Sequence, residues 1–327
     1  MFRLLVSDKV NNEGLKPLIE SEAVEVVQKS VSEAEDELNL FDALLVRSST
    51  KVTKELLGKM TSLKIIGRVG VGVDNIDIDE ATKQGVIVIN APNGNTISVA
   101  EHTLAMISSL MRHIPQANIS VKAKEWNRSA FVGSELYGKI LGIIGFGRIG
   151  IEVAKRAKAF GMKVHVFDPI LTPERANNFG VEMLSFDEVL SSADIITVHA
   201  PLNEKTRGLL NKDTLAKTRK GVRIINCARG GIIEEEALLE ALENGHVAGA
   251  ALDVFEVEPP IHSKLADHPS VIATPHIGAS TKEAQFKVAA QIAEEVLRFI
   301  KGMPVRFSVN FPPVAQEENI NKQLILH

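Results

Sequence analysis

The chain contains little of several residue types that would narrow its function at once. Of its 327 residues, one is cysteine, one is tryptophan and one is tyrosine. The lone Cys227 excludes a disulfide within the chain and any metal site built on several cysteines, and we expect no bound metal. No apolar run approaches the ~20 residues of a membrane-spanning helix, and the N-terminus MFRLLVSDKV lacks a secretory signal. We therefore expect a cytoplasmic protein with no membrane partner.

An excess of charge of one sign is also missing. The 37 Lys and Arg residues against 41 Asp and Glu leave a net charge of −4. Because nucleic-acid surfaces are normally basic, we expect no nucleic-acid partner. The 45% hydrophobic and 24% charged residues are typical of a globular protein, and the length favours two domains over one.

Short apolar stretches alternate with amphipathic helical patterns along most of the chain. Strands are expected at residues 2–6, 24–27, 43–46, 64–66, 86–89, 140–144, 163–167, 194–198, 222–226, 247–252 and 271–273. Helical patterns include residues 32–38, 53–57, 77–83 and 282–300, and a helix from a capping box at Ser98 and Glu101 to about His113. This alternation predicts an α/β fold with parallel sheets covered by helices on both faces. The turn-forming residues 90–95 are a candidate linker.

A glycine-rich turn between two expected strands is the strongest motif. Gly145, Gly147 and Gly150 follow the strand at 140–144 in G-x-G-x-x-G spacing, and Asp168 ends the strand after the next helix. In this context the glycines allow a tight turn and close approach of a pyrophosphate to the helix N-terminus. Asp168 can accept hydrogen bonds from ribose hydroxyls and would repel a 2′-phosphate. The motif predicts NAD rather than NADP, although three glycines alone also occur in ordinary strand–turn–helix units.

Three residues in later loops have the chemistry that hydride transfer to NAD requires. His276 is the candidate base, because imidazole titrates near neutral pH. Glu258, before Pro259 and Pro260, can accept a hydrogen bond from the second ring nitrogen and fix the tautomer. Arg229, followed by two glycines, can bind a carboxylate bidentately. Taken singly, His276 is also consistent with a buried or capping histidine, Glu258 with a solvated loop acid, and Arg229 with a surface salt bridge.

Longer motifs show that the chain resembles the D-isomer-specific 2-hydroxyacid dehydrogenases, especially the branch that acts on 3-phosphoglycerate. They are VRSSTKV (46–52), GRVGVGVDNID (67–77), NAPNGNTISVAEHT (90–103), GIIGFGRIG (142–150), VHAPL (198–202), NCARGGI (226–232), AALDVFEVEPP (250–260) and TPHIGAST (274–281). The resemblance implies two doubly wound parallel-sheet domains, a Rossmann-type NAD domain and a flavodoxin-like substrate domain. It places the substrate domain at residues 1–97, the NAD domain at 98–290 and a return segment to the substrate domain at 291–327.

The resemblance also implies roles for individual residues. Arg229 is expected to bind the substrate carboxylate, and Glu258 to orient His276, the acid/base. Further expected cofactor contacts, besides Arg229 and His276, are Arg148, Ile149, His199, Ala200, Pro201, Cys227, Ala228, Asp253 and Gly278. Expected substrate contacts, again besides Arg229 and His276, are Arg47, Arg68, Val69, Gly70 and, from a second subunit, Arg128. Val71 departs from the pattern, because some relatives carry a threonine there.

The implied activity is NAD-dependent oxidation of 3-phospho-D-glycerate to 3-phosphohydroxypyruvate, the first step of serine biosynthesis, by a homodimer. Two alternatives stay open. One is reduction of glyoxylate, hydroxypyruvate or another short 2-keto acid, and the other is an NAD(H)-sensing corepressor. The sequence ends at His327, where many relatives continue into regulatory domains. We therefore expect a catalytic core, either a natural short form or a shortened chain, without feedback by serine.

Overall fold

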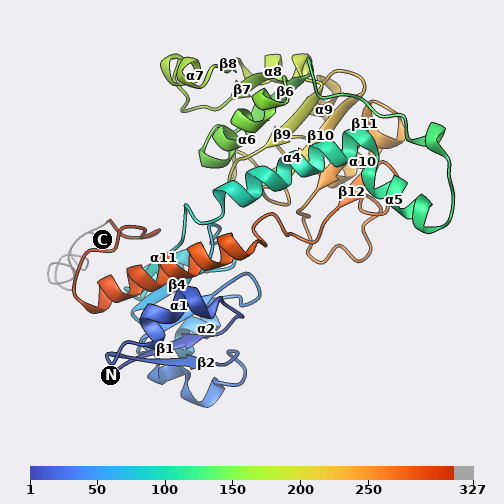
Figure 1. The fold of residues 1–327 in the computed structure, drawn as a ribbon. Coiled ribbons are helices and arrows are strands. Elements are labelled where there is room, and N and C mark those ends of the chain that lie inside the picture. The colour runs from blue at the N-terminus through green and yellow to red at the C-terminus, as the bar shows by residue number, and fades with distance from the viewer. Residues whose placement is uncertain (313–327) are drawn as a thin grey trace. The chain divides into compact units, whose positions relative to one another are not determined.

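The computed structural model describes residues 1–312, which form two compact units (Figure 1). The first unit contains residues 1–95 and the segment from Ser280 onward, and the second contains residues 96–279. The part of the expected return segment that follows Pro312 lies outside the described residues. Each unit is built on a parallel sheet with helices on both faces. The expected α/β class is confirmed.

The sheet of the first unit has five strands in the order β2-β1-β3-β4-β5, all paired in parallel. The strands are β1 (Phe2–Val6), β2 (Val24–Gln28), β3 (Ala43–Val46), β4 (Ile65–Arg68) and β5 (Ile87–Ile89). The helices are α1 (Asn12–Ile19), η1 (Glu35–Leu40), α2 (Lys54–Lys59), α3 (Ile78–Lys83) and α11 (Lys282–Ile300). This strand order is that of flavodoxin-like folds, as expected for this part of the chain.

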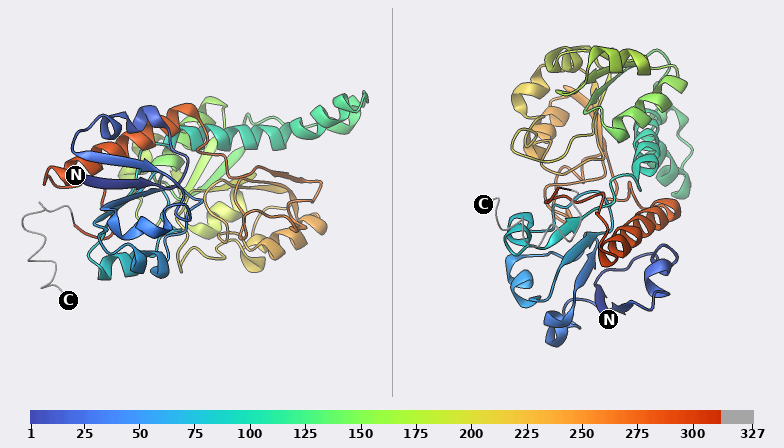
Figure 2. Two further views of the ribbon diagram at one scale, coloured as in Figure 1. Left: turned by 90° about the horizontal axis from the view of Figure 1, so that it is seen from below. Right: turned by 90° about the vertical axis from the view of Figure 1, so that its left-hand side faces the viewer.

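Helix α11 belongs wholly to the first unit, where it packs beside α1 and over β4 (Figures 1 and 2). A Cβ atom added to Gly14 in α1 would lie 2.6 Å from Cβ of Ala289, so the two helices need glycine at this position to approach so closely. The expected boundary after residue 290 falls inside this helix. Because buried residues on both sides of that point, such as Val288 and Ile292, contribute to one core, the return to the first unit starts at Ser280 instead.

The sheet of the second unit has seven parallel strands in the order β12-β11-β10-β9-β6-β7-β8. They are β6 (Ile140–Ile144), β7 (Lys163–Phe167), β8 (Glu182–Met183), β9 (Ile195–Val198), β10 (Val222–Asn226), β11 (Val247–Leu252) and β12 (Val271–Ala273). The strand order reverses between β6 and β9, which pair directly. In doubly wound sheets such a reversal is the usual ligand-binding position, because the loops on its two sides diverge.

Helices cover both faces of this sheet. They are α4 (Thr96–Arg112), α5 (Ile114–Lys122), η2 (Arg128–Phe131), α6 (Arg148–Ala159), α7 (Pro173–Phe179), α8 (Phe186–Ser192), α9 (Lys212–Ala216) and α10 (Glu235–Glu243). Ile143 packs in the core under α4 and α6, while its neighbour Ile144 packs in the core under α8, α9 and α10. This alternation along one strand is the consequence of a side-chain period of two.

Two local expectations are wrong. Residues 32–38 do not form an α-helix, and a 3₁₀ helix covers residues 35–40 instead. Glu33 accepts hydrogen bonds from both the N–H and the hydroxyl of Ser30, which stabilises a turn there, and the residue before η1 provides no side-chain cap. The capping box at Ser98 is also wrong, because α4 begins at Thr96 and a buried Ser98 lies inside its first turn.

An arm of residues 113–138 extends from the seven-stranded sheet of the second unit (Figure 2). It begins at His113, whose φ of 54° turns the chain between α4 and α5. Large apolar side chains are exposed along it, namely Ile114, Ile119, Val121, Trp126, Val132 and Tyr137. Within residues 1–312, no helix has the length and apolarity needed to span a membrane.

Candidate active site

Most candidate residues of the second unit follow strands of its sheet. Gly145 follows β6, Asp168 follows β7, His199 follows β9, Arg229 follows β10, and His276 follows β12. Since all these strands run parallel, their carboxyl ends lie at one edge of the sheet. Arg128 is the exception. It lies in η2 on the exposed arm rather than at this edge.

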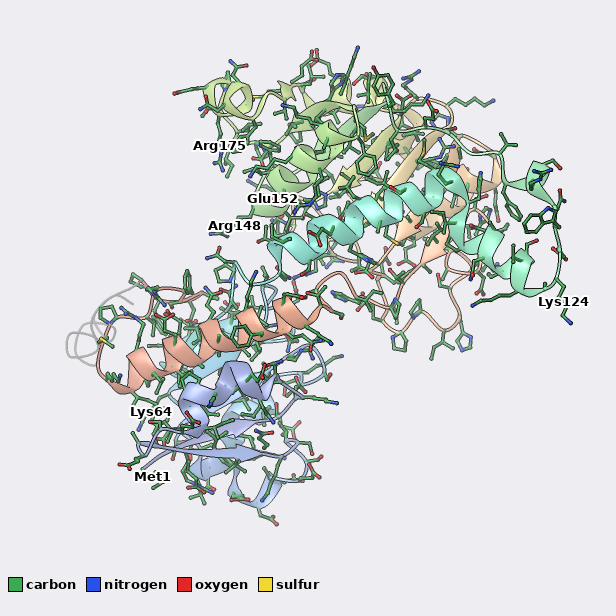
Figure 3. All side chains as sticks on the ribbon, viewed as in Figure 1. Met1, Lys64, Lys124, Arg148, Glu152 and Arg175 are labelled. Carbon is green, nitrogen blue, oxygen red and sulfur yellow. The ribbon has the colours of Figure 1, made fainter. Side chains whose placement is uncertain are left out.

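The glycine turn after β6 is packed as the fingerprint requires. Gly145 has a φ of +94°, and a Cβ atom there would lie 2.5 Å from the carbonyl oxygen of His199. A Cβ atom on Gly150 in α6 would lie 2.3 Å from the carbonyl oxygen of Gly145. Gly147, at the N-cap of α6, has open space at its Cβ position. The N-terminus of α6, marked by Arg148 in Figure 3, is therefore open to a phosphate group.

Asp168 is bonded directly to the glycine turn. One carboxylate oxygen accepts the N–H of Phe146 at 2.7 Å, and the other accepts the N–H of Ile170 at 2.9 Å. These bonds hold the carboxylate beside the turn. Because each carboxylate oxygen has two lone pairs, both can accept a further hydrogen bond from a ribose hydroxyl.

Two titratable side chains near this edge are uncharged at neutral pH. Burial lowers the pKa of His199 to about 4. Its Nε2 lies 3.0 Å from the hydroxyl of Thr197, and its buried Nδ1 has no hydrogen-bond partner within residues 1–312. Burial also raises the pKa of Cys227 to about 12, assisted by the charge of Asp253. Cys227 is therefore a thiol at neutral pH and is not a nucleophile.

The loop that carries Arg229 is shaped by the buried side chain of Asn226. The Asn226 amide accepts the N–H of Ala228 at 3.0 Å and donates to the carbonyl of Arg229 at 2.8 Å. A Cβ atom on Gly230 would lie 1.8 Å from the carbonyl oxygen of Phe255, so only glycine fits. The guanidinium donates to the carbonyl of Ala228 at 2.6 Å. The Arg229 loop is thus packed against the loop that follows β11.

Glu258 and His276 form a hydrogen-bonded pair. The Nδ1 atom of His276 lies 2.8 Å from Oε2 of Glu258, and Oε1 of Glu258 accepts the N–H of Phe255 at 3.2 Å. Burial would raise the pKa of Glu258, but the hydrogen bond and charge of His276, with the N–H of Phe255, lower it overall. The ionised carboxylate holds a proton on Nδ1, which leaves Nε2 available to exchange a proton with a ligand.

The turn that carries His276 is held from beneath by Asp253. The N–H groups of Ile277 and Gly278 each donate to the Asp253 carboxylate at 2.8 Å. These bonds fix the backbone directly after His276, whose own φ is 53°. The orientation of the imidazole thus depends on a buried carboxylate at the end of the neighbouring strand.

Two side chains that the sequence analysis did not assign to the site complete this arrangement. The Thr274 hydroxyl donates to Asp253 at 2.6 Å, and Nε2 of His102 lies 3.3 Å from the same oxygen. Burial would raise the pKa of Asp253, but these two groups and the two N–H donors together lower it. The position of Thr274, two residues before His276, is a sequence signal that could have placed it in the site. His102, inside α4, has no comparable signal in the sequence.

In the first unit, Arg47 and Arg68 stand at neighbouring strand ends. Arg68 ends β4 and is paired with Val46, the residue before Arg47. A Cβ atom on Gly70 would lie 1.6 Å from the Arg68 guanidinium, so glycine makes room for this side chain. The Arg47 guanidinium donates to the carbonyl of Lys9 at 3.1 Å. The two arginines therefore lie on adjacent strand ends at the carboxyl edge of this sheet.

Comparisons with known proteins establish the family. Residues 104–278 match the family model described as D-isomer specific 2-hydroxyacid dehydrogenase, NAD binding domain. The chain belongs to this family, and its second unit is an NAD-binding domain. The fold is also similar to that of D-lactate dehydrogenase from Aquifex aeolicus, solved with NAD and lactic acid, with a TM-score of 0.82 and 31% identity. That match covers 95% of this chain and 99% of the solved one.

Among curated relatives, D-3-phosphoglycerate dehydrogenase from Bacillus subtilis is 74% identical over 318 residues. The human D-3-phosphoglycerate dehydrogenase is 47% identical over 311 residues. The matches cover 97% and 94% of this chain, but 61% and 58% of the respective relatives. The chain therefore spans about three fifths of the length of these relatives. Within residues 1–312, no group of three or more His, Cys, Asp or Glu side chains is arranged to hold a metal ion.

The low pKa of His199 predicts a pH-dependent stability. Between its ordinary value near 6.5 and about 4, the unfolded chain binds a proton that the folded chain does not. Stability should therefore fall as the pH decreases through this window, by up to about 3 kcal/mol. Urea unfolding of the cofactor-free protein at pH 7, 5.5 and 4.5 measures this loss. His199→Asn should flatten the dependence, whereas the exposed-site control His262→Asn should not; equal slopes in all three proteins would contradict the assignment.

Proposed function

We propose that the chain catalyses NAD-dependent oxidation of 3-phospho-D-glycerate to 3-phosphohydroxypyruvate, the first step of serine biosynthesis. The observation that carries the reaction type is the Glu258–His276 pair at 2.8 Å, on the strand ends of an NAD-binding domain. The Arg229 loop, packed against the loop that carries Glu258, supports it with a cation for the substrate carboxylate. The similarity to D-3-phosphoglycerate dehydrogenases from bacteria and mammals supports the choice of substrate.

In this proposal each of the three residues has one task. Arg229 binds the substrate carboxylate with its planar guanidinium, which suits a bidentate contact. His276 accepts the C2 hydroxyl proton on Nε2. Glu258 keeps the ring oriented through Nδ1 and stabilises the imidazolium that forms. Bound NAD supplies the acceptor for the hydride that leaves C2, so that one proton and two electrons are removed as a hydride and one proton goes to the imidazole.

The residues present fit NAD. The open position at Gly147 and the N-terminus of α6, with Arg148 and Ile149, would hold the pyrophosphate. Asp168 would accept from the adenosine ribose. The nicotinamide half would lie against the loops after β9, β10, β11 and β12, namely His199, Ala200, Pro201, Cys227, Ala228, Asp253 and Gly278. His199 and Cys227 are uncharged, which suits contact with an aromatic ring.

The first unit is the proposed substrate-binding domain. Arg47 and Arg68 would bind the phosphate, with the backbone of Val69 and Gly70 near the carboxylate. Their support is the pairing of β3 with β4, which places the two arginines on adjacent strand ends. Asn90 donates to the carbonyl of Val71 at 2.7 Å, and this bond holds the turn after Gly70.

Replacing His276 tests the reaction type. His276→Ala should lower kcat by a factor of roughly 10²–10⁴, because general base catalysis contributes about that much. NADH affinity, measured by fluorescence titration, should change little, since the main cofactor contacts lie on other loops. Loss of NADH binding in step with activity would show that His276 serves the cofactor and not the proton transfer. Unchanged turnover would show that His276 is not the base, and no turnover by the unaltered protein would favour an NAD(H)-sensing binding protein.

A substrate panel tests the phosphate. The panel compares four substrates at equal concentrations, each with the matching oxidised or reduced cofactor: phosphoglycerate, glycerate, lactate and glyoxylate. A second comparison sets NAD against NADP. We expect phosphoglycerate to have the highest kcat/KM and Arg47→Ala to raise its KM. NAD should be preferred, because the Asp168 carboxylate would repel the 2′-phosphate of NADP. Comparable rates for the unphosphorylated acids would favour the second candidate, a reductase of short 2-keto acids. The similarity to a glyoxylate reductase structure, at 30% identity, keeps this candidate open.

We also propose that the protein is a cytoplasmic homodimer in which Arg128 serves the partner's site. The support for self-association is the arm, where Trp126, Val132 and Tyr137 are each 78% exposed. Several large apolar side chains at such exposure are typical of surfaces that are covered in an assembly. Sedimentation at micromolar concentration should give a mass of twice the 35.5 kDa of one chain. The Trp126→Glu variant should have a mass closer to that of a single chain. A single-chain mass for the unaltered protein would refute the dimer.

A further inference from the structure

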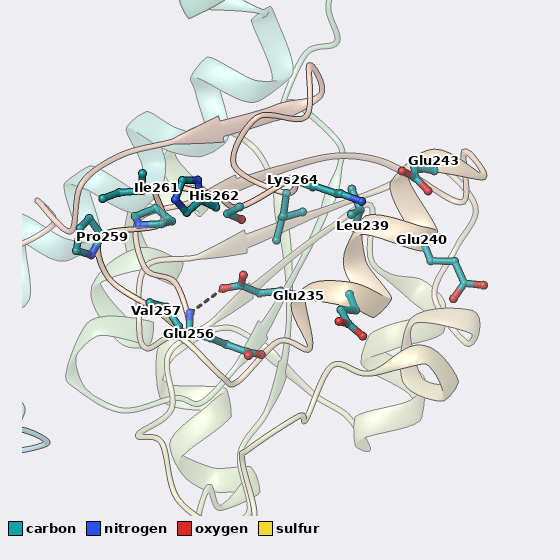
Figure 4. A pocket seen from close by; sticks show the side chains of 14 residues that line it. Glu235, Leu239, Glu240, Glu243, Glu256, Val257, Pro259, Ile261, His262 and Lys264 are labelled. Carbon is teal, nitrogen blue, oxygen red and sulfur yellow. Dashed lines mark hydrogen bonds between the residues drawn. The ribbon is translucent and has the colours of Figure 1, made fainter.

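The loop that carries Glu258 is held by a carboxylate from another element. Glu235 is the first residue of α10, and its Oε1 accepts the N–H of Glu256 at 2.7 Å. Figure 4 shows the Glu235 side chain directed at this main-chain nitrogen. The side chain is partly buried, and burial raises the pKa of Glu235 above its ordinary value. A partly buried carboxylate in a main-chain hydrogen bond is not an ordinary surface charge.

This hydrogen bond acts on a peptide unit that is constrained on both sides. The carbonyl of Phe255 and the nitrogen of Glu256 belong to one planar peptide. The carbonyl side lies against Gly230, where no Cβ atom would fit. The nitrogen side is bonded to Glu235. Gly230 and Glu235 together therefore determine the orientation of the peptide between residues 255 and 256.

The residue that begins this peptide, Phe255, is hydrogen-bonded to the Glu258–His276 pair. The N–H of Phe255 donates to Oε1 of Glu258 at 3.2 Å, while Oε2 is 2.8 Å from the imidazole. The N–H of Phe255 belongs to the preceding peptide, whereas Glu258 follows the peptide between residues 255 and 256. If that peptide rotates, the chain leading to Glu258 is redirected and its carboxylate moves away from the N–H of Phe255 and from His276. The position of Glu258 then depends on a residue that has no contact with His276.

We propose that Glu235 is a positioning residue for the reaction, which keeps Glu258 at hydrogen-bond distance from His276 by fixing the peptide between Phe255 and Glu256. The inference rests on the proposed function and adds a residue to it. Glu235 touches neither the imidazole nor the region assigned to substrate, so its effect is transmitted through the loop.

Glu236 provides a matched control. It is the next residue of α10, in the same helical turn, and it lines the same groove of about 820 Å³ beside the loop. Both acids favour the helix N-terminus by their charge. Glu236 is exposed and has no hydrogen bond to another side chain or to the backbone of the loop within the described residues. Changes that come only from helix stability or groove charge should be the same for both residues.

The experiment compares Glu235→Asp, Glu235→Gln and Glu236→Ala in the full chain with bound NAD. Asp keeps the charge and favours the helix start, but its side chain is one methylene shorter and withdraws from the N–H of Glu256. Gln keeps an oxygen acceptor at full length. We expect Asp to lower kcat about tenfold, with KM and NADH affinity nearly unchanged, Gln to retain most activity, and Glu236→Ala to match the unaltered protein.

The pH profile and a double-mutant cycle separate positioning from general destabilisation. In Glu235→Asp the acid side of the kcat/KM profile should move in the direction that Glu258→Ala moves it, since both weaken the same pair. In a Glu258→Ala background, Glu235→Asp should have no further effect on kcat. An equal factor in both backgrounds would overturn the inference. The inference would also be overturned if Glu235→Asp had normal activity while Glu235→Gln lost activity. If Glu258→Ala alone leaves turnover unchanged, the proposed function has failed instead.

Discussion

The parallel pairing of the strands is the constraint on which the candidate site depends. Because every strand of the seven-stranded sheet runs in the same direction, loops separated by up to about 130 residues of chain end at one edge. The glycine turn, Arg229, Glu258 and His276 are brought to one edge of the sheet by this geometry. Nothing in their local sequences requires it. The reversal of strand order between β6 and β9 then separates the neighbouring loops and leaves room for a dinucleotide.

Within that edge, positions are set mainly by hydrogen bonds between side chains and the backbone. Asp253 fixes the N–H groups after His276, Asn226 shapes the Arg229 loop, and Asp168 is bonded to the glycine turn. Each of these acceptors or donors is buried or partly buried, where an unmade hydrogen bond costs about 1–3 kcal/mol. The loops are therefore held in one arrangement by contacts within the chain itself.

Much of the fold could be predicted because strand and helix periodicities are local properties. Strands β1, β3, β6, β7, β10, β11 and β12 have the expected bounds, and α11 has both of its expected ends. Local competition accounts for the errors at residues 32–38 and at Ser98, where side-chain bonds or an earlier helix start override the pattern. The two-residue strand β8 is too short to show a period. The return of α11 to the first unit was implied by resemblance, but the whole helix belongs there because residues along its length, such as Val288 and Ile292, contribute to one core.

The sequence by itself determined the α/β class, the glycine turn with its acid, and the three residues with suitable chemistry. Each depends on spacing within a short window, where residue type and period are sufficient. Only the tertiary structure decided which side chains support them. His102 reaches Asp253 from a helix about 150 residues earlier in the chain, and Glu235 reaches the Glu258 loop from the start of α10. Such contacts join distant parts of the chain, and no local pattern encodes them, because they follow from the way the helices pack on the sheet.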